Sequence, residues 1–572
     1  MSPIDVGMHI HVVPNRGSPP TVLLRESYRE GDKVRKRTLA NLSDLSSEQI
    51  EAIRAALRGE ALQPVAQSLE ITASRAHGHV QAVTLAMQRL GFASLVASKP
   101  SHERDLVLAM VAARIVAPNT KLATTRWWHT CTLAADFGVA DSDEDNLYAA
   151  MDWLLARQDS IQAKLAARHL SDGGLVLYDL SSSYFEGTTC PLAKLGHNRD
   201  GKKGLLQVNY GLLTNALGCP VAVSVHEGNV ADSATFVPEV QRLREQFGIE
   251  HLVIVGDRGM IGHKAIAELR QLDGVDWIGA LKNTSIRALV EQGQLQLGLF
   301  DERNLIELTA PEYPGERLVA CRNPQLAALR AHKREDLLRS TEKNLQAIKD
   351  RVDAGRLAGA DGIGVSVGKI VNKHKVAKHF ELTIGGDSFS FARKPEAISA
   401  EAALDGIYII RTSVDAQRMD AADCVRNYKA LANVERAFRS LKTVDLKVRP
   451  IHHRTADRVR THILLCMLAY YVEWHMRQAW AALMFTDTDQ AAKATRDPVA
   501  PAARSDEALD KVHHRTLDDG TPVHSFRTLI DEMATIVRNT CRTPGADTSF
   551  DVCTTPTHKQ RQALDLIREI AV

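Results

Sequence analysis

The stretch GGLVLYDLSSSYFEG, residues 173–187, decides the fold. Its apolar run from Leu175 to Tyr178 ends abruptly at Asp179, and three serines follow. A short continuous apolar run of this kind predicts a strand that is buried on both faces. Such a strand delivers a carboxylate to the edge of a sheet. Because an aspartate at a strand end often only caps a turn, Asp179 alone does not distinguish a turn from a functional site.

A second apolar run repeats the arrangement. HLVIVGDRGMIG, residues 251–262, again ends in one carboxylate, Asp257, which lies between Gly256 and Gly259. In an α/β sheet, ligands collect outside the carboxyl ends of the strands. Two neighbouring strands that each place an aspartate there bring like charges within a few Å, which is costly without a cation. Oxygen ligands, without a Cys/His motif, favour Mg²⁺ or Mn²⁺.

A third carboxylate lies on a helix predicted from Asp420. At about 100° per residue, one stripe of this helix carries Tyr428, Leu431, Glu435, Phe438 and Lys442. Glu435 lies near the middle of an otherwise apolar face and needs a partner there. A metal ion shared with the two aspartates supplies one. The alternative is an ordinary amphipathic helix whose Glu435 and Lys442 reach water at the edge of the stripe.

The order of the surrounding runs predicts a mixed α/β sheet. Runs at 175–180, 205–214 and 220–228 follow one another without helices, so we expect antiparallel neighbours. Runs at 251–257 and 275–282 alternate with helices, which indicates parallel pairing. The helix after the third run is expected to use Asp232 or Ser233 as its N-cap.

Changes of pattern along the chain predict several parts. A small α+β region is followed by a helical region, and a β-rich insertion with one charged helix (323–355) interrupts the sheet. The end of the chain reads as loop-rich up to a last short helix. The expected divisions are 1–75, 76–170, 171–284 (core), 285–405 (insertion), 406–480 (core again) and 481–572.

Composition restricts the class of protein. The chain has 572 residues, of which 44% are hydrophobic and 24% charged, as in ordinary globular proteins. The net charge of +2 does not by itself indicate a nucleic-acid partner. Eight scattered cysteines without a CxxC motif argue for reduced thiols and against a zinc ribbon. The sequence has no signal-peptide pattern. Its longest apolar run is interrupted by Glu473 before it is long enough to span a bilayer. We therefore expect a cytoplasmic protein.

Together these residues resemble the DDE transposases of bacterial insertion sequences. The resemblance covers about 173–480 and is closest to the cut-and-paste subgroup with a β-rich insertion before the catalytic Glu. The helix signature of that subgroup is Tyr-x2-Arg-x3-Glu-x6-Lys. This chain matches it at Tyr428, Glu435 and Lys442 and departs at Leu431, where an Arg is expected. The segment GNVAD (228–232) also resembles one that the family places after its third strand.

The resemblance implies an RNase H-like core with catalytic, metal-binding Asp179, Asp257 and Glu435 and two Mg²⁺ or Mn²⁺ ions. It implies an enzyme that binds the ends of a mobile element, cleaves DNA and joins the 3′-OH ends to target DNA. Implied partners are double-stranded DNA and a second copy of the chain on that DNA, in a nucleoid-associated cytoplasmic setting without a membrane. One alternative is an RNase H-like nuclease that joins nothing. Another is a non-catalytic DNA-binding derivative, against which the intact carboxylate triad argues.

A basic stretch follows Glu435. It holds eight lysines and arginines against Asp445 and Asp457 (Arg436, Arg439, Lys442, Lys447, Arg449, Arg454, Arg458 and Arg460), together with His452, His453 and His462. Beside a metal site such a stretch predicts phosphate contacts, whereas by itself it could be a solvated helix face. The DNA-contact candidates are Tyr428, Arg436, Arg439, Lys442 and Arg258.

Other candidates for DNA contact lie towards the N-terminus. The cluster from Arg25 to Arg37 could contact phosphates, and by analogy 76–170 would bind the element ends. For Trp127, Trp128 and His129, buried packing is favoured over stacking on bases. The remaining histidines show no metal-ligand spacing and are interpreted as structural.

Overall fold

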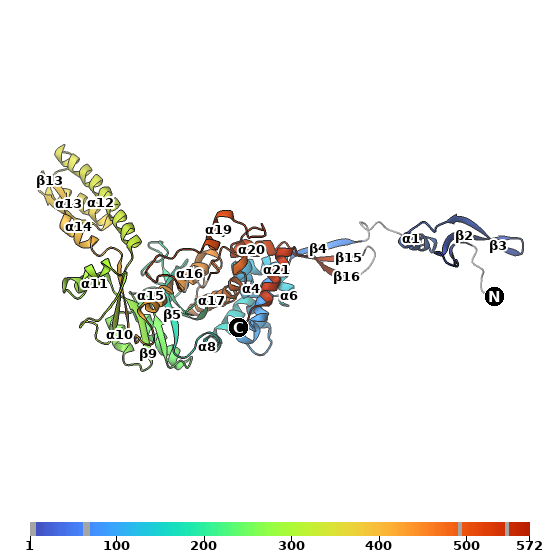
Figure 1. The fold of residues 1–572 in the computed structure, drawn as a ribbon, viewed down its shortest axis with the longest axis horizontal. Coiled ribbons are helices and arrows are strands. Elements are labelled where there is room, and N and C mark those ends of the chain that lie inside the picture. The colour runs from blue at the N-terminus through green and yellow to red at the C-terminus, as the bar shows by residue number, and fades with distance from the viewer. Residues whose placement is uncertain (1–6, 61–68, 490–494, 544–547, 572) are drawn as a thin grey trace. The chain divides into compact units, whose positions relative to one another are not determined.

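The computed structural model describes residues 7–60, 69–489, 495–543 and 548–571. The chain divides into two compact units (Figure 1). The N-terminal unit comprises Met1–Arg75 and Val537–Thr554, and the main unit comprises Ala76–Ile536 and Thr555–Val572. The main unit therefore includes the helical region, the sheet and most of the C-terminal region, which the sequence analysis assigned to separate parts.

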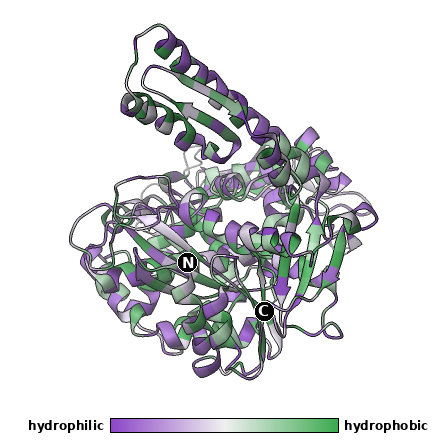
Figure 2. Cartoon of the chain, turned by 90° about the vertical axis from the view of Figure 1, so that its left-hand side faces the viewer, coloured by the Kyte–Doolittle hydropathy of each residue, from purple (hydrophilic) through white to green (hydrophobic). Residues whose placement is uncertain are grey.

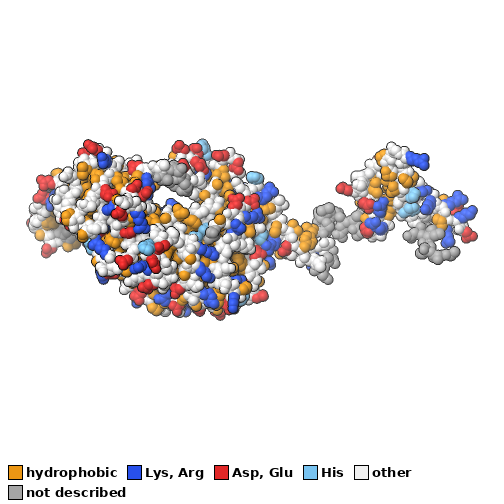
Figure 3. All heavy atoms as spheres, turned by 60° about the horizontal axis from the view of Figure 1, so that its bottom comes forward, with side chains coloured by type: hydrophobic (Ala, Val, Ile, Leu, Met, Phe, Trp, Pro, Cys, Tyr) orange, Lys and Arg blue, Asp and Glu red, His pale blue; other side chains and the backbone are white. Residues whose placement is uncertain are grey.

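The N-terminal unit contains two small sheets and a helix. Strands β1 (Met8–Val13), β2 (Thr21–Glu30) and β3 (Lys33–Asn41) form an antiparallel sheet, and α1 (Ser47–Leu57) follows. Ser46 caps α1 and forms a capping box with Gln49. Figure 3 shows Lys and Arg side chains gathered on this unit. Two of the arginines are paired: Arg37 lies 2.7 Å from Glu26 and Arg35 lies 2.5 Å from Glu30.

The second sheet of this unit joins distant parts of the sequence. Strand β4 (Glu70–Ala76) lies beside β15 (Val537–Arg542), which pairs with β16 (Ser549–Cys553). The expectation of a loop-rich C-terminal region was wrong here, because the partner of β15 is more than 400 residues away in the sequence. Helices α19 (Asp506–His514) and α20 (Phe526–Met533) were also not expected, whereas α21 (His558–Arg568) is the last short helix that the sequence predicted.

Residues 78–169 are helical, as predicted. The helices are α2 (Gly78–Arg89), α3 (Phe92–Val96), α4 (His102–Val116), α5 (Lys121–Trp127), α6 (Leu133–Asp136), α7 (Glu144–Leu155) and α8 (Gln158–His169). They pack around α17 (Ala456–Ala479), which is buried along most of its length and contacts α2, α4 and α7. Trp128 is fully buried, in agreement with the packing role favoured for it. One continuous hydrophobic core joins this layer to the large sheet.

The large sheet has eight strands in the order β10-β11-β14-β9-β8-β5-β6-β7. The strands are β5 (Gly174–Tyr184), β6 (Gln207–Asn215), β7 (Pro220–Glu227), β8 (Leu252–Val255), β9 (Val275–Ala280), β10 (Leu305–Leu308), β11 (Arg317–Arg322) and β14 (Ile407–Thr412). The predicted pairing is confirmed: β5, β6 and β7 are antiparallel neighbours, whereas β5, β8 and β9 run parallel. Figure 2 shows these strands largely in the hydrophobic colour.

Helices α9 (Asp232–Glu245) and α10 (His263–Leu269) follow β7 and β8. The predicted N-cap of α9 was wrong. Ala231 occupies the cap position, and the Asp232 carboxylate forms an ion pair with Arg199 instead. Asp232 therefore pairs with Arg199 of the loop after β5 and does not cap the helix.

The insertion is mainly helical, so the expectation of a β-rich lobe was wrong. It contains α11 (Asn283–Glu291), α12 (Pro324–Asp353), α13 (Ala360–His374) and α14 (Pro395–Ala402), with one hairpin of β12 (Phe380–Ile384) and β13 (Phe389–Arg393). Strands β10 and β11 extend the edge of the large sheet. Residues 324–402 form an arm with a core of its own (Figure 1).

The sequence of α13 explains this error. Its glycines and β-branched residues are typical of a strand or loop. However, Ile363, Val367 and Val371 repeat every fourth residue and bury one face of α13 in the arm core, together with Leu345 and Ile348 of α12. Tertiary packing therefore outweighs the weak helix propensity of this segment.

Among the described residues, no single helix has the length and hydrophobicity of a membrane span. Helix α4 reaches that threshold only jointly with Lys121–Thr130, across a bend of 87°.

Candidate active site

Asp179 and Asp257 lie at the same level of two adjacent strands. In the parallel pair of β5 and β8, Leu177 lies opposite Val255. Two residues further along the chain come Asp179, which is still within β5, and Asp257, which lies just beyond the end of β8. At Gly256 the chain passes very close to Phe236. A Cβ on Gly256 would lie 2.7 Å from the Phe236 ring. Only glycine fits this position, and it lets the chain turn the second carboxylate out at the sheet edge.

Glu435 comes from a helix that packs on the same strands. Helix α16 (Leu431–Arg439) contacts β5 and β6 and buries Val434, Ala437 and Phe438. The Phe438 ring lies 5.8 Å from the ring of Tyr210 on β6. Glu435 projects from the exposed side of α16, and its charge acts on Asp179. The structure therefore brings together all three carboxylates that the sequence analysis singled out.

The repulsion between these groups affects Asp179. Its pKa is raised to about 7, chiefly by burial and also by the charges of Asp257 and Glu435, against the opposing effects of the Leu180 N–H and of Arg199. The Leu180 N–H donates to Asp179 Oδ1 at 2.8 Å. The charged form of Asp179 is stabilised by any cation that binds beside it.

Tyr428 contacts the second aspartate. Its hydroxyl donates to Asp257 Oδ1 over 3.5 Å, a long hydrogen bond. Burial, followed by the charge of Asp257, raises the pKa of Tyr428, so the phenol stays protonated and can donate. Tyr428 therefore helps to orient Asp257, which is itself exposed.

The helix that carries Glu435 is not continuous, unlike the predicted one. It is divided into α15 (Ala421–Lys429), α16 and a π-helical turn at Ser440–Val444. Within α16 the core face consists of Leu431, Val434, Ala437 and Phe438. Glu435 lies outside this face and is exposed instead of lying in the middle of an apolar stripe. An exposed Glu435 is open to a ligand, which a buried one would not be.

The predicted DNA-contact residues fall into two groups. Arg258, Arg436 and Arg439 are exposed close to the carboxylates in the sequence and structure. Lys442 is buried instead and donates to Asp200 Oδ1 over 3.1 Å. Arg449 forms an ion pair with the same carboxylate. A cavity of about 350 Å³ remains beside them, and Lys202 and Lys447 also line it.

Two of the three histidines in the basic stretch carry no charge at neutral pH. Burial lowers the pKa of His453 to about 3 and holds that of His462 well below its ordinary value. The His462 Nε2 lies 3.0 Å from the Val448 carbonyl oxygen. These rings stabilise the loop before α17 and add nothing to the positive charge of this surface.

A basic groove lies between the arm and the sheet, and the sequence analysis did not identify it. It encloses about 520 Å³. Its charged lining is Arg258, Arg287, Arg330, Lys333, Arg334, Lys375 and Lys378, against Glu401 and Asp405. The run of basic residues at 330–334 was a signal that could have indicated this surface. Because Arg258 directly follows Asp257, the groove begins beside the carboxylates.

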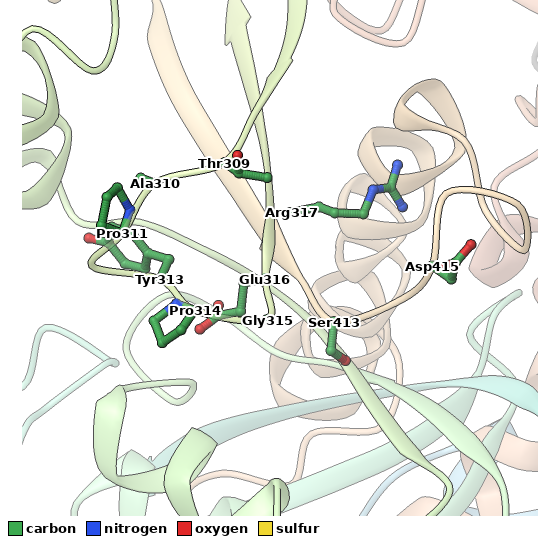
Figure 4. A pocket seen from close by; sticks show the side chains of 10 residues that line it. All are labelled: Thr309, Ala310, Pro311, Tyr313, Pro314, Gly315, Glu316, Arg317, Ser413 and Asp415. Carbon is green, nitrogen blue, oxygen red and sulfur yellow. The ribbon is translucent and has the colours of Figure 1, made fainter.

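Another cavity, of about 510 Å³, lies at the opposite edge of the sheet (Figure 4). It is formed where β11 begins and β14 ends, and β14 is antiparallel to β9. Its charged groups already have partners: Glu316 accepts from Arg411 at 2.6 Å, and Arg317 donates to Glu307 at 2.8 Å. This cavity is therefore separate from the carboxylate site.

Comparisons with known proteins agree with this geometry. The family described as "Transposase DDE domain" matches residues 179–472, a range that begins at Asp179 and includes Asp257 and Glu435. A second family, "IS1634 family transposase, N-terminal domain", matches residues 10–67. No curated protein matches the chain.

Among solved structures, one similar chain is the piggyBac transposase in a synaptic complex with hairpin DNA. It shares 8% sequence identity with this chain, at a TM-score of 0.34, over 79% of this chain and 77% of that one. The match to the DDE domain covers more than half of the sequence, and the N-terminal match names the same kind of protein. The chain belongs to the DDE transposases of insertion sequences.

Proposed function

We propose that Asp179, Asp257 and Glu435 are the catalytic carboxylates of this DDE transposase and that they hold two Mg²⁺ or Mn²⁺ ions, which would help the enzyme to cleave and join DNA. The observation that carries this proposal is the meeting of three carboxylates where β8 ends beside the middle of β5, with a pKa of about 7 for Asp179. Oxygen-only ligands and an unfavourable excess of negative charge fit hard divalent cations.

Each side chain has a distinct part in this proposal. Bound here, the ions would activate water or a 3′-hydroxyl group and stabilise the leaving oxygen. Asp179 is anchored in a buried strand and holds its position through the Leu180 N–H. Tyr428 orients the exposed Asp257. Glu435 reaches the site from a separate helix, so the site is complete only when α16 is packed on β5.

The same proposal extends to the path of the DNA. Exposed Arg258, Arg436 and Arg439 would contact phosphates beside the carboxylates, together with Tyr428. The basic groove would hold the adjoining backbone, because seven lysines and arginines line it. Lys442, paired with Asp200, would position the loop before α17 and contribute to the neighbouring cavity.

Further parts of the proposal rest on the fold. The order β7-β6-β5-β8-β9, with an antiparallel meander followed by parallel strands, supports an RNase H-like core. Residues 7–60 and the helical layer would help to bind the element ends, and two copies would assemble on DNA. An enzyme with chromosomal substrates would work in the cytoplasm, at the nucleoid.

The decisive experiment compares amide variants of the three acids. Asp179→Asn, Asp257→Asn and Glu435→Gln should each lower cleavage of a labelled end-containing duplex by about 10²-fold or more. Glu268→Gln, which changes an exposed acid on α10, is the control and should cleave like the parent. Affinity for the duplex in a gel-shift titration should stay close to that of the parent, because lysines and arginines supply most of it.

Two outcomes would contradict the proposal. Cleavage at the parent rate by any of the three variants would remove that carboxylate from the mechanism, and undiminished cleavage in EDTA would remove the metal. A supercoiled target plasmid in the same reaction separates the transposase from a nuclease, since only the transposase produces joined products.

A further inference from the structure

A second group of metal ligands lies outside the carboxylate site. We propose that His169, Cys219 and His475 bind a transition-metal ion, with Zn²⁺ as the preferred ion. One ligand atom from each residue lies within 4.8 Å of those of the other two. They come from the end of α8, the turn before β7 and the last part of α17. The sequence analysis treated these histidines as structural, because the three ligands are far apart in the sequence and show no metal-ligand spacing.

The distances suit a small tetrahedral site. With metal–ligand bonds of about 2.0–2.3 Å, the ligand atoms of a zinc site lie roughly 3.3–3.6 Å apart. Cys219 Sγ already lies 3.9 Å from His475 Nε2. The ligand atoms therefore need to move together by about 1.5 Å or less around an ion.

The donor set is selective. Two imidazoles and one sulfur suit Zn²⁺ or copper and are poor ligands for Mg²⁺. Burial lowers the pKa of His169 and brings that of His475 to about 3, so both rings are neutral and have the form that binds metals. Burial also raises the pKa of the Cys219 thiol. Binding would therefore release one proton from Cys219 as the sulfur–metal bond forms.

One of the three ligands borders a cavity. This cavity, of about 210 Å³, is lined by His169, Asn215 and Leu217, next to the turn that carries Cys219. The fourth ligand would be a water molecule or the Tyr471 hydroxyl, which lies 3.0 Å from His169 Nε2.

The position of this cluster in the fold indicates a structural role for the metal ion. Strand β6 runs antiparallel to β5, and Asn215 lies opposite Val176, whereas Leu212 lies opposite Asp179. The turn with Cys219 is therefore at the opposite edge of the sheet from the carboxylates. Both α8 and α17 pack on β7. A metal ion would connect these two helices to the β6–β7 turn and hold the helical layer to the sheet.

Cobalt is the probe for this site, since Co²⁺ replaces Zn²⁺ and reports its ligands by absorption. The full chain, stripped with a chelator and reduced, should bind one equivalent of Co²⁺ with a thiolate-to-cobalt charge-transfer band and tetrahedral d–d bands. Zn²⁺ should displace the cobalt, whereas excess Mg²⁺ should not. Cys219→Ser should abolish the charge-transfer band and weaken binding at least tenfold.

Controls separate this site from other thiols and from the carboxylates. Cys190→Ser, at another buried cysteine, and Asp179→Asn should both keep the parent band. If Cys219→Ser does not fold, His169→Gln at the half-buried rim should instead weaken cobalt binding and change the d–d bands.

Absence of a charge-transfer band in the folded parent would overturn the proposal. So would a band that persists in Cys219→Ser or binding that is unchanged in His169→Gln. Either result would leave an uncharged cluster that only packs and hydrogen-bonds. None of these measurements depends on DNA cleavage, so the two metal proposals stand or fall separately.

Discussion

At the scale of single residues, Asp179 couples the active site to stability. Its pKa is about 7 in the folded chain, above the ordinary value of 3.8. The stabilising contribution of the protonated group is therefore complete below about pH 4 and is lost as the pH rises through 7. Without a bound cation, the charged form of Asp179 is disfavoured in the fold. The carboxylate therefore lowers the stability of the metal-free protein at high pH.

The first prediction follows from this loss of stability as the pH rises. In EDTA, Asp179→Asn should raise the free energy of unfolding at pH 8 relative to the parent by at least about 1 kcal/mol, with a much smaller difference at pH 5. Urea unfolding at both pH values measures this. Asp273→Asn, at an exposed position, should show no such pH dependence. An equal effect of Asp179→Asn at both pH values would mean that Asp179 does not titrate near 7.

The second prediction separates two cations of the basic stretch. Lys442→Ala should destabilise the fold, because it leaves the buried Asp200 with one partner fewer. Arg439→Ala, at an exposed position, should keep parental stability and reduce the salt dependence of DNA binding by about one unit of slope. Thermal unfolding and gel shifts at several salt concentrations test both. The reverse pattern would assign the phosphate contact to Lys442.

At this scale the sequence predicted the carboxylates but not all of their surroundings. Asp179 and Asp257 each end an apolar run, a local signal that requires no knowledge of the fold. The exposure of Glu435 was missed because the buried Val434 and Ala437 shift the core face of α16 away from it. The cluster of His169, Cys219 and His475 has no local signal at all, since only the folded chain brings the three residues together.

At the scale of elements, two glycine-containing helices provide opposite tests. A Cβ at Gly364 or Gly368 of α13 would meet open space, so Gly364→Ala and Gly368→Ala should each stabilise the arm by about 0.5–1 kcal/mol. Gly78→Ala in α2 should destabilise the chain, because its Cβ would lie 2.4 Å from the Met533 carbonyl oxygen. Hydrogen exchange in α13 and thermal unfolding report the two effects. Destabilisation by both arm substitutions would contradict the helical assignment of 360–374.

Elements whose pattern and pairing are local were predicted well. Strands β5 to β9 show continuous apolar runs, and the connections between them indicate their direction. Elements that depend on distant partners were not predicted. Helix α13 owes its conformation to packing on α12, and β15 owes its strand character to pairing with β4 and β16. For these segments, burial against a partner outweighs intrinsic propensity.

At the scale of the whole main unit, seven lysines and arginines line one groove, although the net charge of the whole chain is only +2. The combined change Arg330→Glu and Lys333→Glu should weaken binding to any DNA duplex and flatten its salt dependence by about two units of slope. Lys343→Glu, farther along the same helix, is the matched control and should have little effect. Fluorescence anisotropy at several salt concentrations makes the comparison. Equal losses in both proteins would point to a diffuse charge effect instead of a groove.

The buried position of α17 has a consequence for how the chain is made. Helices α2 to α8 leave the ribosome first, but the apolar helix that they surround begins only at residue 456. At about 5–20 residues per second, the interval between residues 170 and 456 lasts on the order of 15–60 s. Throughout this time the nascent helical layer has an uncovered apolar surface that chaperones can bind. A message truncated before residue 456 therefore yields an aggregation-prone fragment, not a smaller folded protein.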